Sequence, residues 1–111
     1  MSPETTRLYL IRHGEVEERY HKIFGGRIDM DLSQQGRRQA SQLAGYLRRH
    51  PVQAVYASPM KRVQQTFAPY VDLGGNPPRT MPDLREVDFG DWTGLGWHDV
   101  KERFGMSAFD W

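Results

Sequence analysis

A short apolar run near the start of the chain is the feature that most constrains its fold. Residues 8–11, Leu-Tyr-Leu-Ile, are followed directly by the triplet Arg12-His13-Gly14. An uninterrupted apolar run of this length predicts a strand buried on both faces, as in the parallel sheets of α/β proteins. Such sheets bind ligands at the carboxyl ends of their strands, so this strand would bring a cation and an imidazole to a ligand site.

Size and composition limit the function classes. The chain has 111 residues, enough for one small domain, and a formal net charge of +1 from 15 basic and 14 acidic side chains. This balance predicts no general affinity for nucleic acid, so any attraction for anions must be local. The absence of cysteine excludes disulfides and thiolate metal ligands. No segment has the pattern of a membrane span or a signal core, and we expect a soluble cytoplasmic protein with no membrane contact.

Helix and strand patterns alternate after the first strand. Ser33 is a candidate N-cap for a helix over residues 33–49, where apolar residues recur at helical spacing until Pro51. Residues 52–57 predict a second, largely apolar strand. Ser58-Pro59 then predicts the cap and the first residue of another helix.

Later patterns are weaker. Pro69 should limit or kink the second helix. The remaining expectations are a loop over 72–78, an extended segment over 80–87, a glycine-rich loop over 88–96 and an amphipathic turn or two over 97–104.

These elements predict a βαβα unit with parallel strands and right-handed crossovers. The expected fold class is a three-layer α/β/α arrangement with a mostly parallel sheet. Only two strands are convincing, however, and the mean hydropathy of −0.72 is low for a buried parallel sheet. We therefore expect residues 1–111 to form one domain whose sheet is incomplete, either because the chain is an N-terminal fragment or because another chain supplies the missing strands.

Four polar side chains lie at or just after predicted strand ends: Arg12, His13, Arg62 and Glu86. Arg62 falls in the first turn of the second helix, where the helix N-terminus adds its own affinity for anions. Arginine guanidinium groups bind phosphate oxygens in pairs. Two arginines, a histidine and a helix N-terminus together predict a phosphate site.

Four blocks in order resemble the histidine phosphatase (phosphoglycerate mutase-like) superfamily, and together they span nearly the whole chain. They are Arg12 to Glu15, Gly26 to Gly36, Ser58 to Thr66, and Leu84 to Gly90. The resemblance implies an N-terminal portion of that family's domain.

The resemblance also implies a mechanism. His13 would attack phosphorus and become phosphohistidine, Arg12 and Arg62 would hold the phosphoryl oxygens, and Glu86 would protonate the leaving oxygen. Water would then hydrolyse the intermediate. The fixed arginine charge would stabilise the transferring group, so neither a metal nor another cofactor is implied. The second ring nitrogen of His13 should be held by a backbone carbonyl.

Two further residues are candidate substrate contacts, Arg19 as an additional cation and Gly26 in a loop. Glu18-Arg19 stands where the mutase branch usually has Trp-Asn, which favours the phosphatase branch. The family's second clamp histidine has no match in this chain. The leading interpretation is a metal-independent phosphomonoesterase acting on a small phosphorylated metabolite. The alternatives are a phosphoglycerate mutase-type isomerase and an inactive truncated domain that binds phosphate or pairs with another chain as an oligomer.

Overall fold

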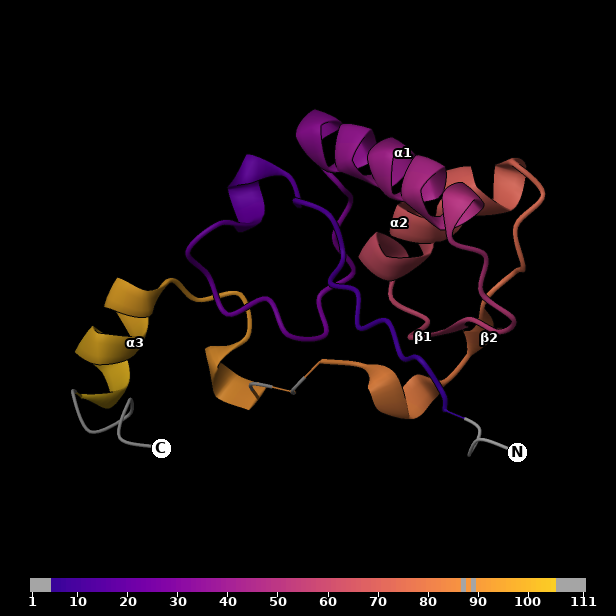
Figure 1. Cartoon of the computed structure of the whole chain (residues 1–111). Helices are drawn as coiled ribbons and strands as arrows, with labels where there is room; N and C mark the ends of the chain where they lie inside the picture. The colour runs from indigo at the N-terminus through magenta and orange to yellow at the C-terminus, as the bar shows by residue number, and fades with distance from the viewer. Residues whose placement is uncertain (1–4, 87, 89, 106–111) are drawn as a thin grey trace.

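The computed structural model describes residues 5–86, 88 and 90–105. Two long helices pack against each other on one side of a short pair of parallel strands (Figure 1). The strands and helices, with three 3₁₀ turns, are η1 (Glu18–Tyr20), α1 (Gln34–Arg49), β1 (Tyr56–Ala57), α2 (Lys61–Asp72), β2 (Arg79–Thr80), η2 (Pro82–Leu84), η3 (Gly90–Trp92) and α3 (Trp97–Phe104). The α/β class is as predicted, and α1 and α2 supply one helical layer of that arrangement. The parallel pair differs from the prediction, because β1 pairs with β2 and not with residues 8–11.

Helix α1 follows the sequence prediction closely. The Ser33 hydroxyl accepts a hydrogen bond from the Gly36 N–H at 3.0 Å and caps the helix. The apolar stripe of the sequence faces inward, with Ala44 and Leu47 buried. The helix ends at Arg49, just before Pro51, which cannot continue it. Residues 97–104 likewise form the predicted short helix, α3.

The second strand and helix differ in extent from their predictions. The strand ladder covers only β1 within the predicted 52–57, with Tyr56 opposite Arg79 in β2. Helix α2 begins after the N-cap Met60, because the Ser58 hydroxyl accepts from the Met60 N–H at 3.3 Å and closes a turn before the helix. Pro69 does not end the helix, which continues to Asp72.

The prediction of a buried strand over residues 8–11 is wrong for this structure. The segment belongs to no strand, and Leu8 is 75% and Leu10 87% exposed. Tyr9 packs on a helix, with its ring edge-on to Tyr46 of α1 at 6.4 Å between the ring centroids. A doubly buried strand needs a paired neighbour and a layer on each face, and the described residues provide neither a ladder nor a second layer for this segment.

The molecule is flat and extended for its length. Its radius of gyration is 17.1 Å and its extents are 57 × 37 × 19 Å, whereas a compact domain of this size has a radius of gyration of about 13 Å. One buried cluster joins the helices to the strands and consists of Ala44, Leu47, Val55, Ala57, Phe67 and Tyr70.

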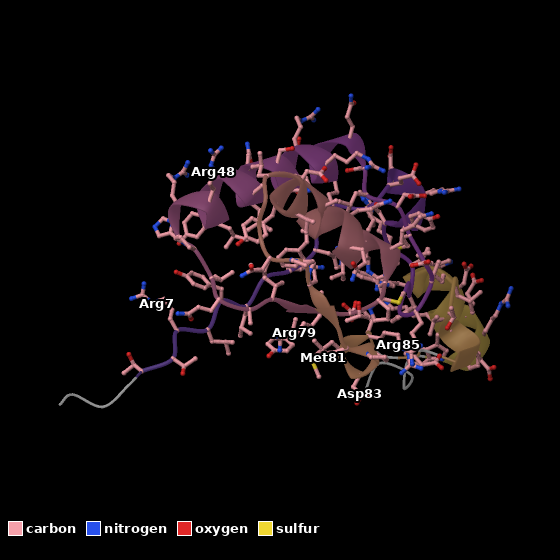
Figure 2. All side chains as sticks on the ribbon, turned by 90° about the vertical axis from the view of Figure 1, so that its right-hand side faces the viewer. Arg7, Arg48, Arg79, Met81, Asp83 and Arg85 are labelled. Atoms are coloured by element: carbon pink, nitrogen blue, oxygen red, sulfur yellow. The ribbon has the colours of Figure 1, made fainter. Side chains whose placement is uncertain are left out.

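In Figure 2, α1 runs across the top of the molecule, and the side chains of Arg79, Met81, Asp83 and Arg85 lie on the opposite, lower side. Met81 is 42% exposed. Within the described residues, no helix has the length and apolar character required to cross a membrane.

Candidate active site

His13 is held in a defined orientation by its own neighbour. Its Nδ1 lies 2.7 Å from the Gly14 carbonyl oxygen, and the side chain is partly buried. A carbonyl oxygen only accepts, so in the neutral imidazole Nδ1 carries the proton and Nε2 carries the lone pair. The predicted backbone-carbonyl partner is therefore confirmed, and Nε2 is the ring nitrogen that this bond leaves free.

Helix α2 fixes the segment that carries His13. The buried Gly14 N–H donates to the Thr66 hydroxyl oxygen at 2.9 Å, and this hydroxyl donates to the Arg62 carbonyl at 2.7 Å. The Thr66 side chain thereby connects residues 13–15, called the histidine segment below, to the turn of α2 that contains Arg62. The sequence signal for Thr66 is its position four residues after Arg62 on the same helix face. It also ends the third motif block, but it was not among the predicted site residues.

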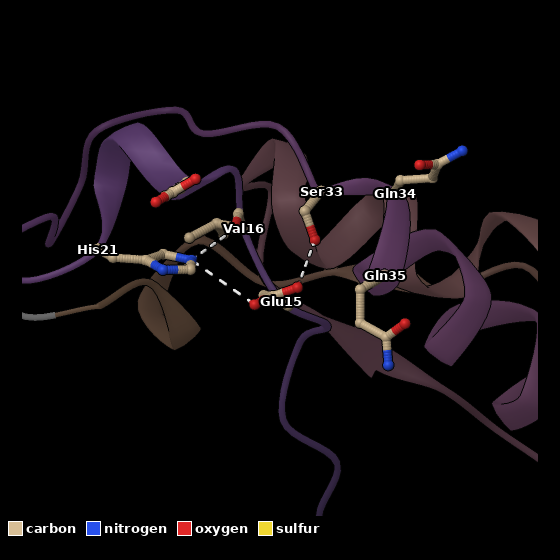
Figure 3. A pocket seen from close by; sticks show the side chains of 7 residues that line it. Glu15, Val16, His21, Ser33, Gln34 and Gln35 are labelled. Carbon is tan, nitrogen blue, oxygen red and sulfur yellow. Dashed lines mark hydrogen bonds and ion pairs between the residues drawn. The ribbon is translucent and has the colours of Figure 1, made fainter.

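Helix α1 fixes the same segment from the other side. A Cβ atom on Gly14 would lie 2.8 Å from the Gly36 carbonyl oxygen, so the two backbones touch. The Ser33 N–H donates to the Glu15 carbonyl at 2.8 Å, and the Ser33 hydroxyl donates to the Glu15 carboxylate at 2.7 Å (Figure 3). The Glu15 N–H donates to the Gln39 side chain at 2.9 Å. The histidine segment is consequently bonded to both long helices.

Arg62 is the most deeply buried charged side chain among the described residues, with 2% of its surface exposed. Its two terminal nitrogens donate to the carbonyl oxygens of Ile28 at 2.8 Å and Gly26 at 2.6 Å, whereas the buried Nε has no partner. Burial lowers the pKa of the Arg62 guanidinium, and the nearby charges of Glu86 and Asp29 partly raise it. An unpaired buried donor costs about 1–3 kcal/mol, and an anionic ligand oxygen at Nε would remove that cost.

The loop over residues 25–31 lies across the start of α2. Asp29 accepts a hydrogen bond from the Lys61 N–H at 2.7 Å, which satisfies a free donor of the first helical turn. Gly26 has a φ of 49°, in the left-handed region that favours glycine. Gly26 is buried, and its carbonyl oxygen accepts a hydrogen bond from Arg62. Gly26 therefore helps to hold the Arg62 side chain in place.

Glu86 is exposed and lies close enough to Arg62 for its charge to act on that guanidinium. Its backbone carbonyl accepts a hydrogen bond from Arg27 Nε at 3.2 Å. The contacts within the described residues therefore connect His13, Arg62, Gly26 and Glu86. Sequence reasoning did not single out Arg27, because an arginine in a loop carries no signal of its partner.

The other two predicted cations are placed differently. Arg12 is exposed. Arg19 pairs with Glu17 at 3.0 Å and covers the Tyr20 ring at 4.7 Å, so its side chain is engaged within its own turn. The contacts found in the described part of the chain do not join Arg12 or Arg19 to Arg62.

A surface pocket of about 400 Å³ adjoins the histidine segment (Figure 3). It is lined by Glu15, Val16, Glu18, His21, Ser33, Gln34 and Gln35. None of the predicted catalytic side chains is among these, so this hollow is separate from the Arg62 site. Glu15 and Ser33, which line this pocket, form the hydrogen bond that anchors the histidine segment.

Comparison with known proteins connects this geometry to a family. The family model of the histidine phosphatase superfamily (branch 1) matches residues 8–111. The adenosylcobalamin/alpha-ribazole phosphatase of Salmonella typhimurium is 34% identical over 105 residues, which are 95% of this chain and 52% of that protein. Phosphoserine phosphatase 1 of Hydrogenobacter thermophilus is 32% identical over 105 residues, 95% of this chain and 50% of that protein.

A solved structure has the same fold over the shared region. The native structure of mycobacterial glucosyl-3-phosphoglycerate phosphatase superimposes with a TM-score of 0.80 at 26% identity, covering 89% of this chain and 47% of that one. The chain thus spans about half the length of the relatives that it matches.

Proposed function

Because the chain belongs to the histidine phosphatase superfamily, we propose that the protein is a phosphomonoesterase that works through a covalent phosphate on His13. The observation that carries the proposal is the bond from His13 Nδ1 to the Gly14 carbonyl, which leaves Nε2 as the attacking atom. Arg62, buried in the first turn of α2, supports the proposal, because its Nε is an unused donor for a phosphoryl oxygen.

In the first half-reaction, His13 Nε2 forms a bond to phosphorus while the bond from phosphorus to the leaving oxygen breaks. Glu86 gives its proton to that oxygen, so the product leaves as an alcohol. Arg62 and Arg12 bind the equatorial oxygens and stabilise their charge during transfer. No metal ion is needed for this step, because the arginine charge takes that role.

In the second half-reaction, water attacks the phosphohistidine. The oxygen–phosphorus bond forms, the phosphorus–Nε2 bond breaks, and the proton of the water goes to the Glu86 carboxylate. Inorganic phosphate leaves and both side chains return to their starting states. The substrate is the phosphate monoester of a small metabolite, and the metabolite is released as the alcohol. Substrate specificity would depend on loops around the site.

The test is the replacement His13→Ala in the natural protein that carries this chain, assayed with p-nitrophenyl phosphate. Loss of a nucleophile should lower kcat by about 10³-fold or more. His98→Ala is the matched control, because the His98 side chain is 83% exposed on α3 and pairs with Glu102 at 3.0 Å, one turn along the same helix.

Turnover retained by His13→Ala would refute the proposal. Acid-labile phosphate trapped on the parent protein, and absent from the variant, would support it. Isomerisation of a phosphoglycerate with little release of inorganic phosphate would instead identify a mutase. Binding of inorganic phosphate without turnover would identify a phosphate-binding domain.

A further inference from the structure

We propose that Arg27 is a positioning residue for Glu86. The contribution of Arg27 to the rate should therefore depend on the leaving group of the substrate. This role of Arg27 rests on the proposed function, because it concerns the proton donor of the same site. It begins from the bond between Arg27 Nε and the Glu86 carbonyl oxygen, 3.2 Å long and spanning 59 residues of sequence.

The base of the Arg27 side chain is fixed by Arg62. The residues on either side of Arg27, Gly26 and Ile28, both give their carbonyl oxygens to the two terminal nitrogens of Arg62. Because Arg62 is 2% exposed and sits in the first turn of α2, these bonds tie the backbone around Arg27 to a rigid element. Arg27 therefore extends from a fixed base to the segment that bears Glu86.

The arrangement leaves the Glu86 carboxyl available for proton transfer. Arg27 bonds to the backbone carbonyl of Glu86, so it places the residue without occupying the carboxyl oxygens. Its positive charge faces Asp88, with 3.9 Å between Arg27 Nη1 and Asp88 Oδ2. The Asp88 charge offsets that of Arg27, so the contact adds little net positive charge beside the proton donor.

A positioning role predicts a specific kinetic pattern. Esters with poor leaving groups need a proton from Glu86 as the bond to phosphorus breaks, whereas esters of acidic phenols do not. Arg27→Met removes the donor but keeps an unbranched side chain. We expect kcat for phenyl phosphate to fall about 5- to 20-fold, since displacing a general acid costs part of its usual 10²- to 10⁴-fold contribution. Turnover of 2,4-dinitrophenyl phosphate should change by less than about twofold, and KM for both substrates should stay the same.

Three variants calibrate this experiment. Glu86→Gln should show the same dependence on leaving group with a larger loss. Arg27→Lys should recover part of the lost rate, because an ammonium still donates one hydrogen bond. Arg38→Met is the matched control, because Arg38 is an exposed arginine bonded only within α1, to Gln35 at 2.7 Å.

A second measurement does not depend on turnover. Arg85 projects from the surface (Figure 2), so trypsin can be used to follow cleavage of the bond between Arg85 and Glu86 by mass spectrometry. Release of the Glu86 segment in Arg27→Met should speed this cleavage at least about threefold, with no change in Arg38→Met.

The outcomes separate the two proposals. Equal losses for both phosphate esters, a rise in KM alone, or an unchanged cleavage rate would overturn the role of Arg27. Turnover that survives His13→Ala would overturn the proposed function, and the cleavage experiment would still report whether Arg27 holds the Glu86 segment.

Discussion

At the scale of single residues, the Thr66 hydroxyl joins the two parts of the candidate site. It accepts from the Gly14 N–H and donates to the Arg62 carbonyl, and it is 3% exposed. Neither partner has access to water as a replacement. Of the contacts that hold the histidine segment, this hydroxyl is the one that connects it directly to Arg62.

Thr66→Val keeps the shape of the side chain but removes the hydroxyl. The Gly14 N–H would then be buried without an acceptor, which should cost about 1–3 kcal/mol in the free energy of unfolding. Urea denaturation measures this cost, and the turnover of the variant should fall because His13 loses its anchor. Thr66→Ser retains the hydroxyl and should preserve both bonds. Equal stability of the valine and serine variants would show that the hydroxyl contributes nothing.

At the scale of elements, the site depends on a close contact between the histidine segment and the first turn of α1. Gly36 is buried, and a Cβ atom there would run into the Glu15 carbonyl oxygen and lie 3.0 Å from the Glu15 nitrogen. These are backbone atoms, so the collision cannot be relieved by a side-chain rotation. The histidine segment and α1 would have to separate.

Two glycine replacements in α1 should therefore have opposite effects. Gly36→Ala should destabilise the protein by about 1–3 kcal/mol, as overpacking does. Gly45→Ala has only an Arg49 side-chain atom at 3.9 Å from its new Cβ, and it should stabilise by about 0.5–1 kcal/mol through higher helix propensity. Thermal unfolding of both variants tests the pair. A stabilising Gly36→Ala would contradict the observed contact.

At the scale of the whole molecule, the flat shape leaves several large apolar side chains exposed. Leu8, Leu10, Tyr56 and Leu84 are 75%, 87%, 52% and 54% exposed. Exposed apolar side chains in such numbers favour association over a monomeric state. The backbone of residues 8–11 has no strand partner among the described residues, so it is free to add to another sheet.

The isolated 111-residue chain should therefore self-associate or melt at low temperature. Sedimentation velocity across a concentration series should show a concentration-dependent increase in size. Leu10→Lys should reduce it, because a charge interrupts the apolar run without touching the core. Ala68→Lys, at an exposed position on α2, is the control for added charge. A stable monomer with a cooperative thermal transition would refute this prediction.

Local signals in the sequence determined the helices and the order of the chemical groups. Ser33 and Pro51 bound α1 because a cap and a missing N–H act on adjacent residues. The four motif blocks predicted one site from His13, Arg12, Arg62 and Glu86, and the backbone-carbonyl partner of His13 followed from the same reasoning. The structure connects His13, Arg62 and Glu86 through contacts, whereas Arg12 is exposed.

The tertiary structure alone decided how these groups are held, because the contacts that hold them cross large distances in sequence. The bond from Gly14 to Thr66 spans 52 residues and that from Arg27 to Glu86 spans 59. It also decided the state of residues 8–11, since an apolar run becomes a buried strand only where neighbours pair with it and layers cover it. The sequence identified His13 and Arg62 as candidate site residues, and the packing of α1 and α2 around Gly14 determined where His13 lies.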